Sequence, residues 1–131
     1  MMYVWIMIGS ALGGAARYWC SGFAANHFGE TFPMGTLLVN VTGSFIIGFF
    51  ATLTGPDGRI LASTETRQFV MTGFCGGYTT FSSFSLETVR LLRVGEARTA
   101  LLYIGISVVT WLVAVWLGHV LAARLNRLKG S

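Results

Sequence analysis

Apolar residues form four long runs along the chain, separated by short segments rich in polar and turn-forming residues. The runs cover residues 3–25, 34–53, 67–92 and 99–123. Each is close to the roughly 20 residues that a helix needs to cross a bilayer. Ser63 and Thr64, followed by Glu65, form a typical helix start ahead of the third run. The pattern predicts an all-α integral membrane protein, with one four-helix transmembrane domain over residues 1–131.

The composition excludes an ordinary soluble enzyme. Of the 131 residues, 53% are hydrophobic and only 11% are charged, whereas soluble domains carry about 25% charged residues. The chain has no Cys-x-x-Cys, His-Glu-x-x-His or P-loop motif. His27 and His119 are interpreted as residues of the membrane interface. We therefore expect a protein that is not an enzyme.

Lysine and arginine are distributed almost evenly between the two sides of the predicted bundle. Four passes place both termini and the middle loop on one side, with Arg59, Arg67, Arg124, Arg127 and Lys129. The other side carries Arg90, Arg93 and Arg98, together with Arg17 if that residue is counted. Because positive charge in short loops sets orientation, this weak bias suits a protein that inserts both ways up.

The third run differs from an ordinary transmembrane helix. Gly76-Gly77 lies near its middle, and five hydroxyl side chains follow within ten residues: Thr79, Thr80, Ser82, Ser83 and Ser85. Irregular backbone at this depth is tolerated only where protein or a water-filled cavity covers it. The segment predicts a third helix that is broken near its centre, at Gly76-Gly77.

Polar and small residues recur at helical spacing in the other three runs. Asn40 and Ser44 share a face of the second run, and the fourth run carries a stripe of Tyr103, Ser107 and Thr110. Gly9 and Gly13 have the spacing of a close helix contact.

These polar residues have two interpretations. Hydroxyl and amide groups often join membrane helices by hydrogen bonds, and Phe81 and Phe84 are then packing residues. Alternatively, the neutral donors and the positive ring edges line a path for a small anion, since a cation would prefer carboxylates or carbonyls. Glu87 is the only carboxylate within a run.

Three segments resemble the Fluc-type fluoride channels, the CrcB family: GGAARY at residues 13–18, GTLLVNVTGSF at 35–45 and GFCGGYTTFSSFSLE at 73–87. With the four-run layout, the resemblance covers the chain up to its basic tail. It implies an antiparallel, dual-topology homodimer in the cell inner membrane, with two fluoride pathways and no nucleic-acid partner.

The resemblance also implies roles for individual residues. A structural Na⁺ at the dimer centre would be held by the backbone carbonyls of Gly76 and Thr79. Arg17 and Glu87 would lie near a vestibule, although Arg17 has a second interpretation as a side chain that reaches the lipid headgroups. The pore residues would be Asn40, Phe81, Phe84, Ser82, Ser83, Tyr103, Ser107 and Thr110.

The expected function is therefore passive export of fluoride, which confers fluoride resistance. The alternative is a small multidrug-type exporter, which is also short and inserts with dual topology. That class depends on a carboxylate deep in its first span, where this chain has none. A non-transporting assembly subunit would leave the polar stripes unexplained.

Overall fold

The computed structural model describes residues 1–29 and 32–130, and it contains helices and no strand within them. The connection predicted over residues 26–33 therefore falls partly outside the described residues, at Glu30 and Thr31. The helices are α1 (Met2–Phe28), α2 (Met34–Leu53), α3 (Thr64–Gln68), the π-helix η1 (Phe69–Cys75), α4 (Gly76–Tyr78), α5 (Phe81–Arg93) and α6 (Ala97–Gly130).

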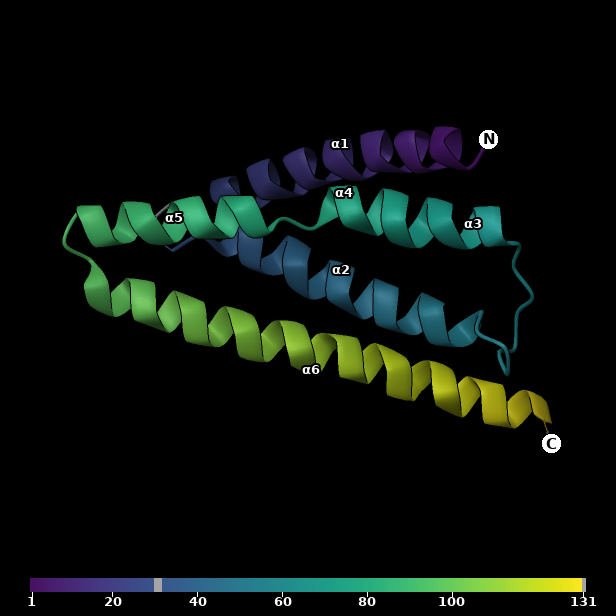
Figure 1. Cartoon of the computed structure of the whole chain (residues 1–131). Helices are drawn as coiled ribbons and strands as arrows, with labels where there is room; N and C mark the ends of the chain where they lie inside the picture. Colours follow the sequence, from purple (N-terminus) through teal and green to yellow (C-terminus); the bar gives the residue numbers. More distant parts are fainter. Residues whose placement is uncertain (30–31, 131) are drawn as a thin grey trace.

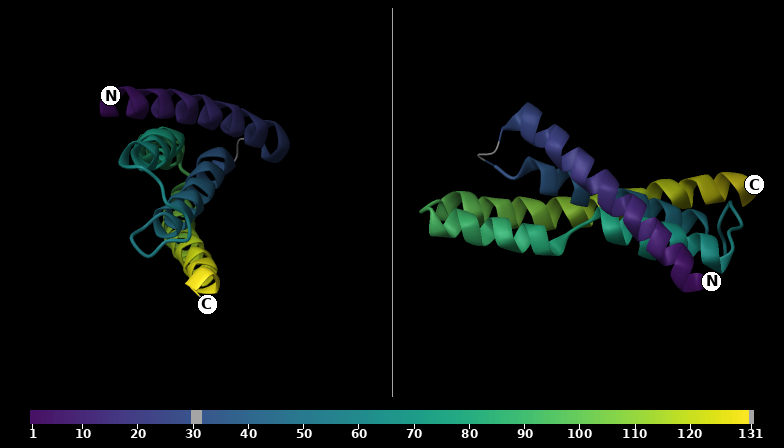
Figure 2. Two further views of the ribbon diagram at one scale, coloured as in Figure 1. Left: turned by 90° about the vertical axis from the view of Figure 1, so that its right-hand side faces the viewer. Right: turned by 90° about the horizontal axis from the view of Figure 1, so that it is seen from above.

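The chain passes four times between the two ends of an elongated bundle. Both termini and the connection from α2 to α3 lie at one end, and α5 turns into α6 at the other (Figure 1). The segments α3, η1, α4 and α5 follow one another along a single pass. Figure 2 shows α1 crossing this pass obliquely, on the side of the bundle away from α6. The arrangement agrees with the predicted placement of both termini and the middle loop together.

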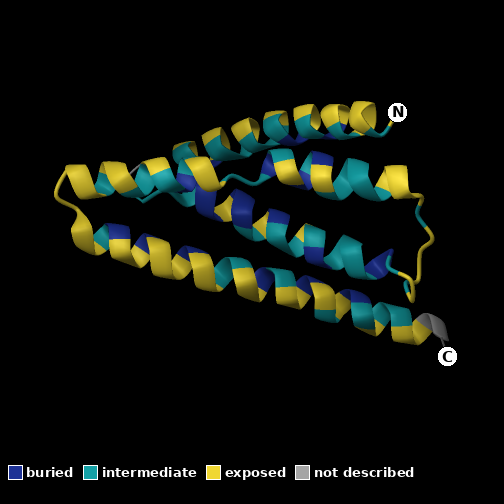
Figure 3. Ribbon diagram, in the orientation of Figure 1, coloured by how far each residue is buried: buried dark blue, intermediate teal, exposed yellow. Residues whose placement is uncertain are grey.

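Exposed residues follow the outer surfaces of α1 and α6 (Figure 3), and many of them are large and apolar. On α6 they include Leu101, Leu102, Val109, Leu112, Val113 and Trp116. Two helices, α2 and α6, are long and apolar enough to cross a bilayer. Soluble monomers rarely expose continuous apolar surface of this kind, so the fold is that of a membrane protein.

Glycines let α2 and α6 pack closely. A Cβ atom added to Gly48 would lie 2.3 Å from the backbone oxygen of Val115, and one added to Gly118 would lie 2.3 Å from that of Phe45. Such distances leave no room for any side chain. Membrane helices approach one another through small residues in this way, because lipid supplies no hydrophobic force that pushes them together.

A second glycine contact joins α1 to η1 and α4. A Cβ on Gly9 would lie 2.5 Å from the Phe69 oxygen, and one on Gly13 would lie 2.2 Å from the Phe74 oxygen. On the opposing segment, a Cβ on Gly77 would lie 2.5 Å from the Ser10 oxygen. The close helix contact predicted from the spacing of Gly9 and Gly13 is confirmed.

The third pass is broken near its centre, but three residues later than predicted. Gly76 and Gly77 are helical and belong to α4, whereas Thr79 and Thr80 have extended backbone. The prediction that Gly76-Gly77 forms the break is therefore wrong. Gly77 lacks a side chain because Ser10 lies against it, and the break occurs where α2 offers hydrogen bonds to the backbone.

The fourth helix is longer than its apolar run. It was predicted to end near residue 123, yet α6 continues to Gly130. Asn126 holds the extension in place: its Nδ2 donates to the Thr52 carbonyl over 3.0 Å, and its Oδ1 accepts from the Arg59 N–H over 2.6 Å. At the start of α3, Ser63 is the N-cap as predicted and accepts from the Thr66 N–H.

Candidate functional site

The centre of the site is the two-residue break at Thr79 and Thr80, which the Asn40 side chain stabilises by hydrogen bonds. Asn40 lies on α2 and is 4% exposed. Its Nδ2 donates to the Thr80 carbonyl over 3.0 Å, and its Oδ1 accepts from the Thr80 N–H over 2.7 Å. The amide thus replaces both partners that a continuous helix would give Thr80. This pairing makes extended backbone tolerable at this depth.

Thr80 also starts the next helix. It is the N-cap of α5, and its Oγ1 accepts from the Ser83 N–H over 3.1 Å. The same oxygen is hydrogen-bonded to the Ser82 hydroxyl over 3.2 Å. A side-chain oxygen at this position satisfies an N–H that the first turn of a helix leaves without a partner. The predicted site residues Ser82 and Ser83 therefore lie in the first turn of α5.

The break releases the backbone carbonyls of residues 76–79 from their helical partners, and those of Gly76 and Thr79 are the two that the resemblance implies for a cation. In a continuous helix they would accept from the N–H groups four residues later, which belong to Thr80 and Ser83. Those two N–H groups are directed instead to Asn40 Oδ1 and Thr80 Oγ1. Carbonyl oxygens released in this way can replace the hydration shell of a small monovalent cation. The chemistry of this donor set fits the implied Na⁺.

Arg17 points into the bundle and not toward the headgroups. Its Nε donates to the Gly77 carbonyl over 3.2 Å, and its side chain is half-buried. The guanidinium therefore lies at the C-terminal end of α4, where a positive charge is favourable. This contact argues against the interpretation of Arg17 as a side chain that only snorkels.

A cavity of about 280 Å³ opens beside the break. Asn40 and Ser44 both line it, as their spacing on one face of α2 predicted, and the described lining residues include no aspartate or glutamate. The lining residues are Asn40, Gly43, Ser44, Ile47, Met71, Cys75, Gly76, Thr79, Thr80, Phe81 and Trp111. The two residues predicted to supply the cation carbonyls and one of the predicted pore phenylalanines thus line one cavity.

The two predicted pore phenylalanines have different surroundings. Phe81 is 72% exposed and lines the cavity, whereas Phe84 is 7% exposed and belongs to the core with Leu37 and Tyr103. Their ring centroids are 5.7 Å apart. Within one chain, Phe84 is a packing residue, and Phe81 presents its ring outward.

The predicted stripe on α6 is only partly buried. Tyr103 and Ser107 are fully buried, while the Thr110 hydroxyl donates to carbonyls of its own helix, those of Ile106 and Ser107. Trp111 continues the line of Tyr103 and Ser107 by four residues and lines the cavity. The sequence reasoning missed Trp111 because an indole counts as apolar. Extending the spacing of four by one more step would have found it.

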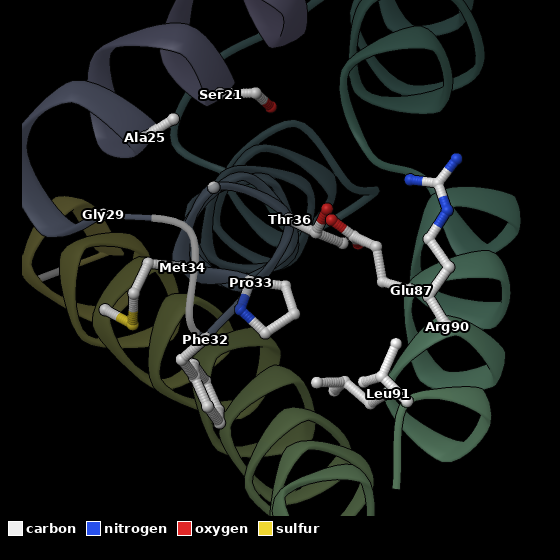
Figure 4. Close-up of a pocket in the computed structure, with 12 residues that line it drawn as sticks. Ser21, Ala25, Gly29, Phe32, Pro33, Met34, Thr36, Glu87, Arg90 and Leu91 are labelled. Atoms are coloured by element: carbon white, nitrogen blue, oxygen red, sulfur yellow. The ribbon is translucent and has the colours of Figure 1, made fainter. Parts of the chain in front are cut away.

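A second cavity of about 440 Å³ lies at the other end of α5, between α1, α2 and α5. Glu87, Arg90 and Thr36 are among the residues around it (Figure 4). The Tyr103 hydroxyl donates to Glu87 Oε1 over 3.1 Å. The carboxylate is thereby linked to the buried stripe of α6, and Glu87 is not one of the residues around the break.

Tyr78, to which the sequence assigned no role, joins three helices next to the break. It is 8% exposed, and its hydroxyl is hydrogen-bonded to Thr42 Oγ1 over 2.8 Å and to Cys20 Sγ over 3.7 Å. Thr42 belongs to α2 and Cys20 to α1. Tyr78 therefore fixes α4 between its neighbours, one residue before the chain becomes extended.

Comparison with known proteins gives consistent matches over the whole chain. Residues 4–119 match the family described as CrcB-like protein, Camphor Resistance (CrcB). A fluoride-specific ion channel of Methylocella silvestris is 59% identical over 131 residues, which is all of both chains. One from Bradyrhizobium diazoefficiens is 62% identical over all of this chain and 91% of its own length. One from Rhodopseudomonas palustris is 60% identical over 99% of this chain and 92% of its own.

Proposed function

The chain belongs to the CrcB-like protein family, and we propose that it is a fluoride-selective channel through which F⁻ leaves the cytoplasm passively. Members of this family are ion channels, so the protein is not an enzyme. The observation that carries the proposal is the cavity at the break, which has polar and aromatic lining residues and no carboxylate among those described.

The cavity offers an anion the kinds of group that replace water. An amide nitrogen carries two N–H groups, and Asn40 uses one of them on the Thr80 carbonyl. Ser44 adds a hydroxyl, and Phe81 adds a ring whose edge carries positive partial charge. Fluoride is small and strongly hydrated, so a pathway for it must offer several such groups in succession.

Passive transport suffices for export because of the acid chemistry of fluoride. HF is a weak acid that crosses membranes as a neutral molecule and ionises in a near-neutral cytoplasm. The ion cannot return through lipid and accumulates. A channel lets the accumulated F⁻ flow out down its gradient, and this is the basis of the proposed fluoride resistance.

The proposed assembly is an antiparallel, dual-topology homodimer of four-span subunits in the cell inner membrane, with two pores. The nearly balanced loop charges support insertion in both orientations. Gly76 is exposed in the single chain although it lies beside the break. In a two-fold dimer a residue near the axis meets its own copy, so an exposed Gly76 at mid-bundle is consistent with a central contact.

The proposed structural Na⁺ would be held at that contact by the Gly76 and Thr79 carbonyls of both subunits. When bound, the ion would supply a fixed positive charge between the two pathways. The residues of this chain contribute by releasing those carbonyls, through the hydrogen bonds from the Thr80 and Ser83 N–H groups to Asn40 and Thr80 side chains.

The test is ion efflux from liposomes that contain only the purified protein. We expect rapid fluoride efflux and no chloride efflux above that of protein-free liposomes. Equal efflux of both anions, or of neither, would remove the proposal. Efflux of a cationic drug coupled to protons would favour the multidrug-type alternative.

A further inference from the structure

Two buried polar atoms on α6 have no hydrogen-bond partner among the described residues: Ser107 Oγ and Trp111 Nε1. Ser107 is fully buried. The other polar side chains nearby are paired, since Tyr103 donates to Glu87 and Thr110 donates to backbone carbonyls. Buried polar groups without a partner are rare in native structures and commonly mark the position of an absent water or ion.

The two atoms belong to one face of α6, because residues four apart lie one turn above the other. The Trp111 ring meets Phe84 edge-on, with centroids 4.9 Å apart and an interplanar angle of 73°. Phe84 in turn lies 5.1 Å from the Tyr103 ring. The Trp111 indole thus belongs to an aromatic cluster with Phe84 and Tyr103, and Trp111 also lines the cavity beside Asn40 and Phe81.

The chemistry of the pair favours an anion. An indole nitrogen only donates, and a hydroxyl can donate as well. A small anion can accept from each of these donors, whereas a cation would be repelled by the N–H group. Both atoms are buried, so the enclosure favours a small ion over a large one.

We propose that Trp111 Nε1 coordinates fluoride on the α6 side of Phe84, beside Ser107, which the family resemblance already implies for the pathway, and that Trp111 is a selectivity-determining residue. This inference rests on the proposed function. In this assignment, the indole N–H donates a hydrogen bond to the ion after the ion has lost part of its hydration shell. Small displacements of the aromatic cluster admit the ion, and chloride, being larger, requires more displacement.

The transport test is the Trp111→Phe variant, which keeps an aromatic ring against Phe84 and removes the N–H donor together with the second ring of the indole. Trp116→Phe is the matched control, because Trp116 lies on the same helix and is 59% exposed. Losing a hydrogen bond to a charged partner corresponds to a decrease of about tenfold or more. We expect such a decrease in fluoride efflux for Trp111→Phe, and unchanged efflux for Trp116→Phe.

A second readout observes the donor directly in the native protein. The four tryptophans give four indole N–H signals in a nitrogen-15 spectrum, and Trp111→Phe identifies one by its absence. We expect sodium fluoride to shift the Trp111 signal, and sodium chloride at equal concentration to leave it unchanged. Ser107→Ala should weaken the fluoride-dependent shift.

The outcomes separate the two proposals. If the native protein conducts no fluoride, the proposed function fails. If the native protein conducts fluoride, either of two results overturns only the assignment of Trp111. The first is that Trp111→Phe conducts fluoride equally well. The second is that fluoride does not shift the Trp111 signal. If Trp111→Phe does not assemble, replacing each of the other three tryptophans in turn assigns the Trp111 signal by elimination, and its response to fluoride in the native protein decides the matter.

Discussion

Asn40 makes two hydrogen bonds with the backbone of Thr80, so it shapes the break as well as lining the cavity. A substitution at this residue therefore tests the two roles together. The adjacent donor on the same face, Ser44, lines the cavity and is not involved in the hydrogen bonds with Thr80. Comparing substitutions at Asn40 and Ser44 therefore separates the effect of losing one hydrogen-bond donor from the effect of disrupting the break.

Replacing Asn40 with aspartate should abolish fluoride transport. A carboxylate cannot donate to the Thr80 carbonyl, and its charge repels an anion in a medium of low dielectric constant. Repulsion of a few kcal/mol corresponds to a decrease of about a hundredfold or more. Liposome efflux measures it, with Ser44→Ala as the control that keeps the break and loses far less flux. Normal flux in Asn40→Asp would place Asn40 outside the pathway.

Phe81 and Phe84 should respond differently to replacement by isoleucine. Both variants lose the ring edge, so we expect large losses of fluoride flux in each, with assembly retained. Phe84 is buried and Phe81 is exposed within the chain, so only Phe84→Ile should lower the free energy of unfolding, by about 1–2 kcal/mol. Efflux and denaturation of each variant check this, and normal conduction by both would reduce the rings to packing residues.

At the scale of elements, the neighbouring glycines Gly76 and Gly77 of α4 have different surroundings. A Cβ on Gly77 would lie 2.5 Å from the Ser10 oxygen of α1, whereas a Cβ on Gly76 would have its nearest neighbour, the Met71 oxygen, at 3.9 Å. Gly77 therefore maintains packing within the chain, and Gly76 has space within it.

Alanine substitutions at these two positions test that difference. Gly77→Ala should destabilise the chain by about 1–3 kcal/mol, as overpacking does, and a thermal melt in detergent would show it. Gly76→Ala should lower the melting temperature less than Gly77→Ala, because the added Cβ has space within the chain. Equal melting temperatures for both variants would contradict the contact between α1 and α4.

Much of this arrangement follows from local patterns in the sequence. The four runs, the N-cap at Ser63 and the contact of Gly9 and Gly13 depend on residues close together in the chain, and the structure agrees with them. The position of the break does not follow in this way, because it is fixed by Asn40, forty residues away from Thr80. The apolar pattern does not predict the α6 extension either, since Asn126 of that extension is held by Thr52 of α2 and by Arg59 in the connection that follows α2.

For the whole molecule, the proposed buried cation adds its binding free energy to assembly, because it binds only the assembled subunits. We expect purified protein to need Na⁺ for full fluoride flux. Replacing Na⁺ with a large organic cation should lower flux and promote dissociation, as size-exclusion chromatography measures. Gly76→Val should act the same way in the presence of Na⁺. Full flux after exhaustive exchange would rule out this role.

The proposed function requires a pore through which fluoride passes and chloride does not. Its decisive test is the reversal potential of the purified protein in a planar bilayer, with unequal fluoride and equal chloride on the two sides. We expect the current to reverse at the equilibrium potential of fluoride. A reversal at zero voltage, where chloride is balanced, would show that the pore does not select fluoride.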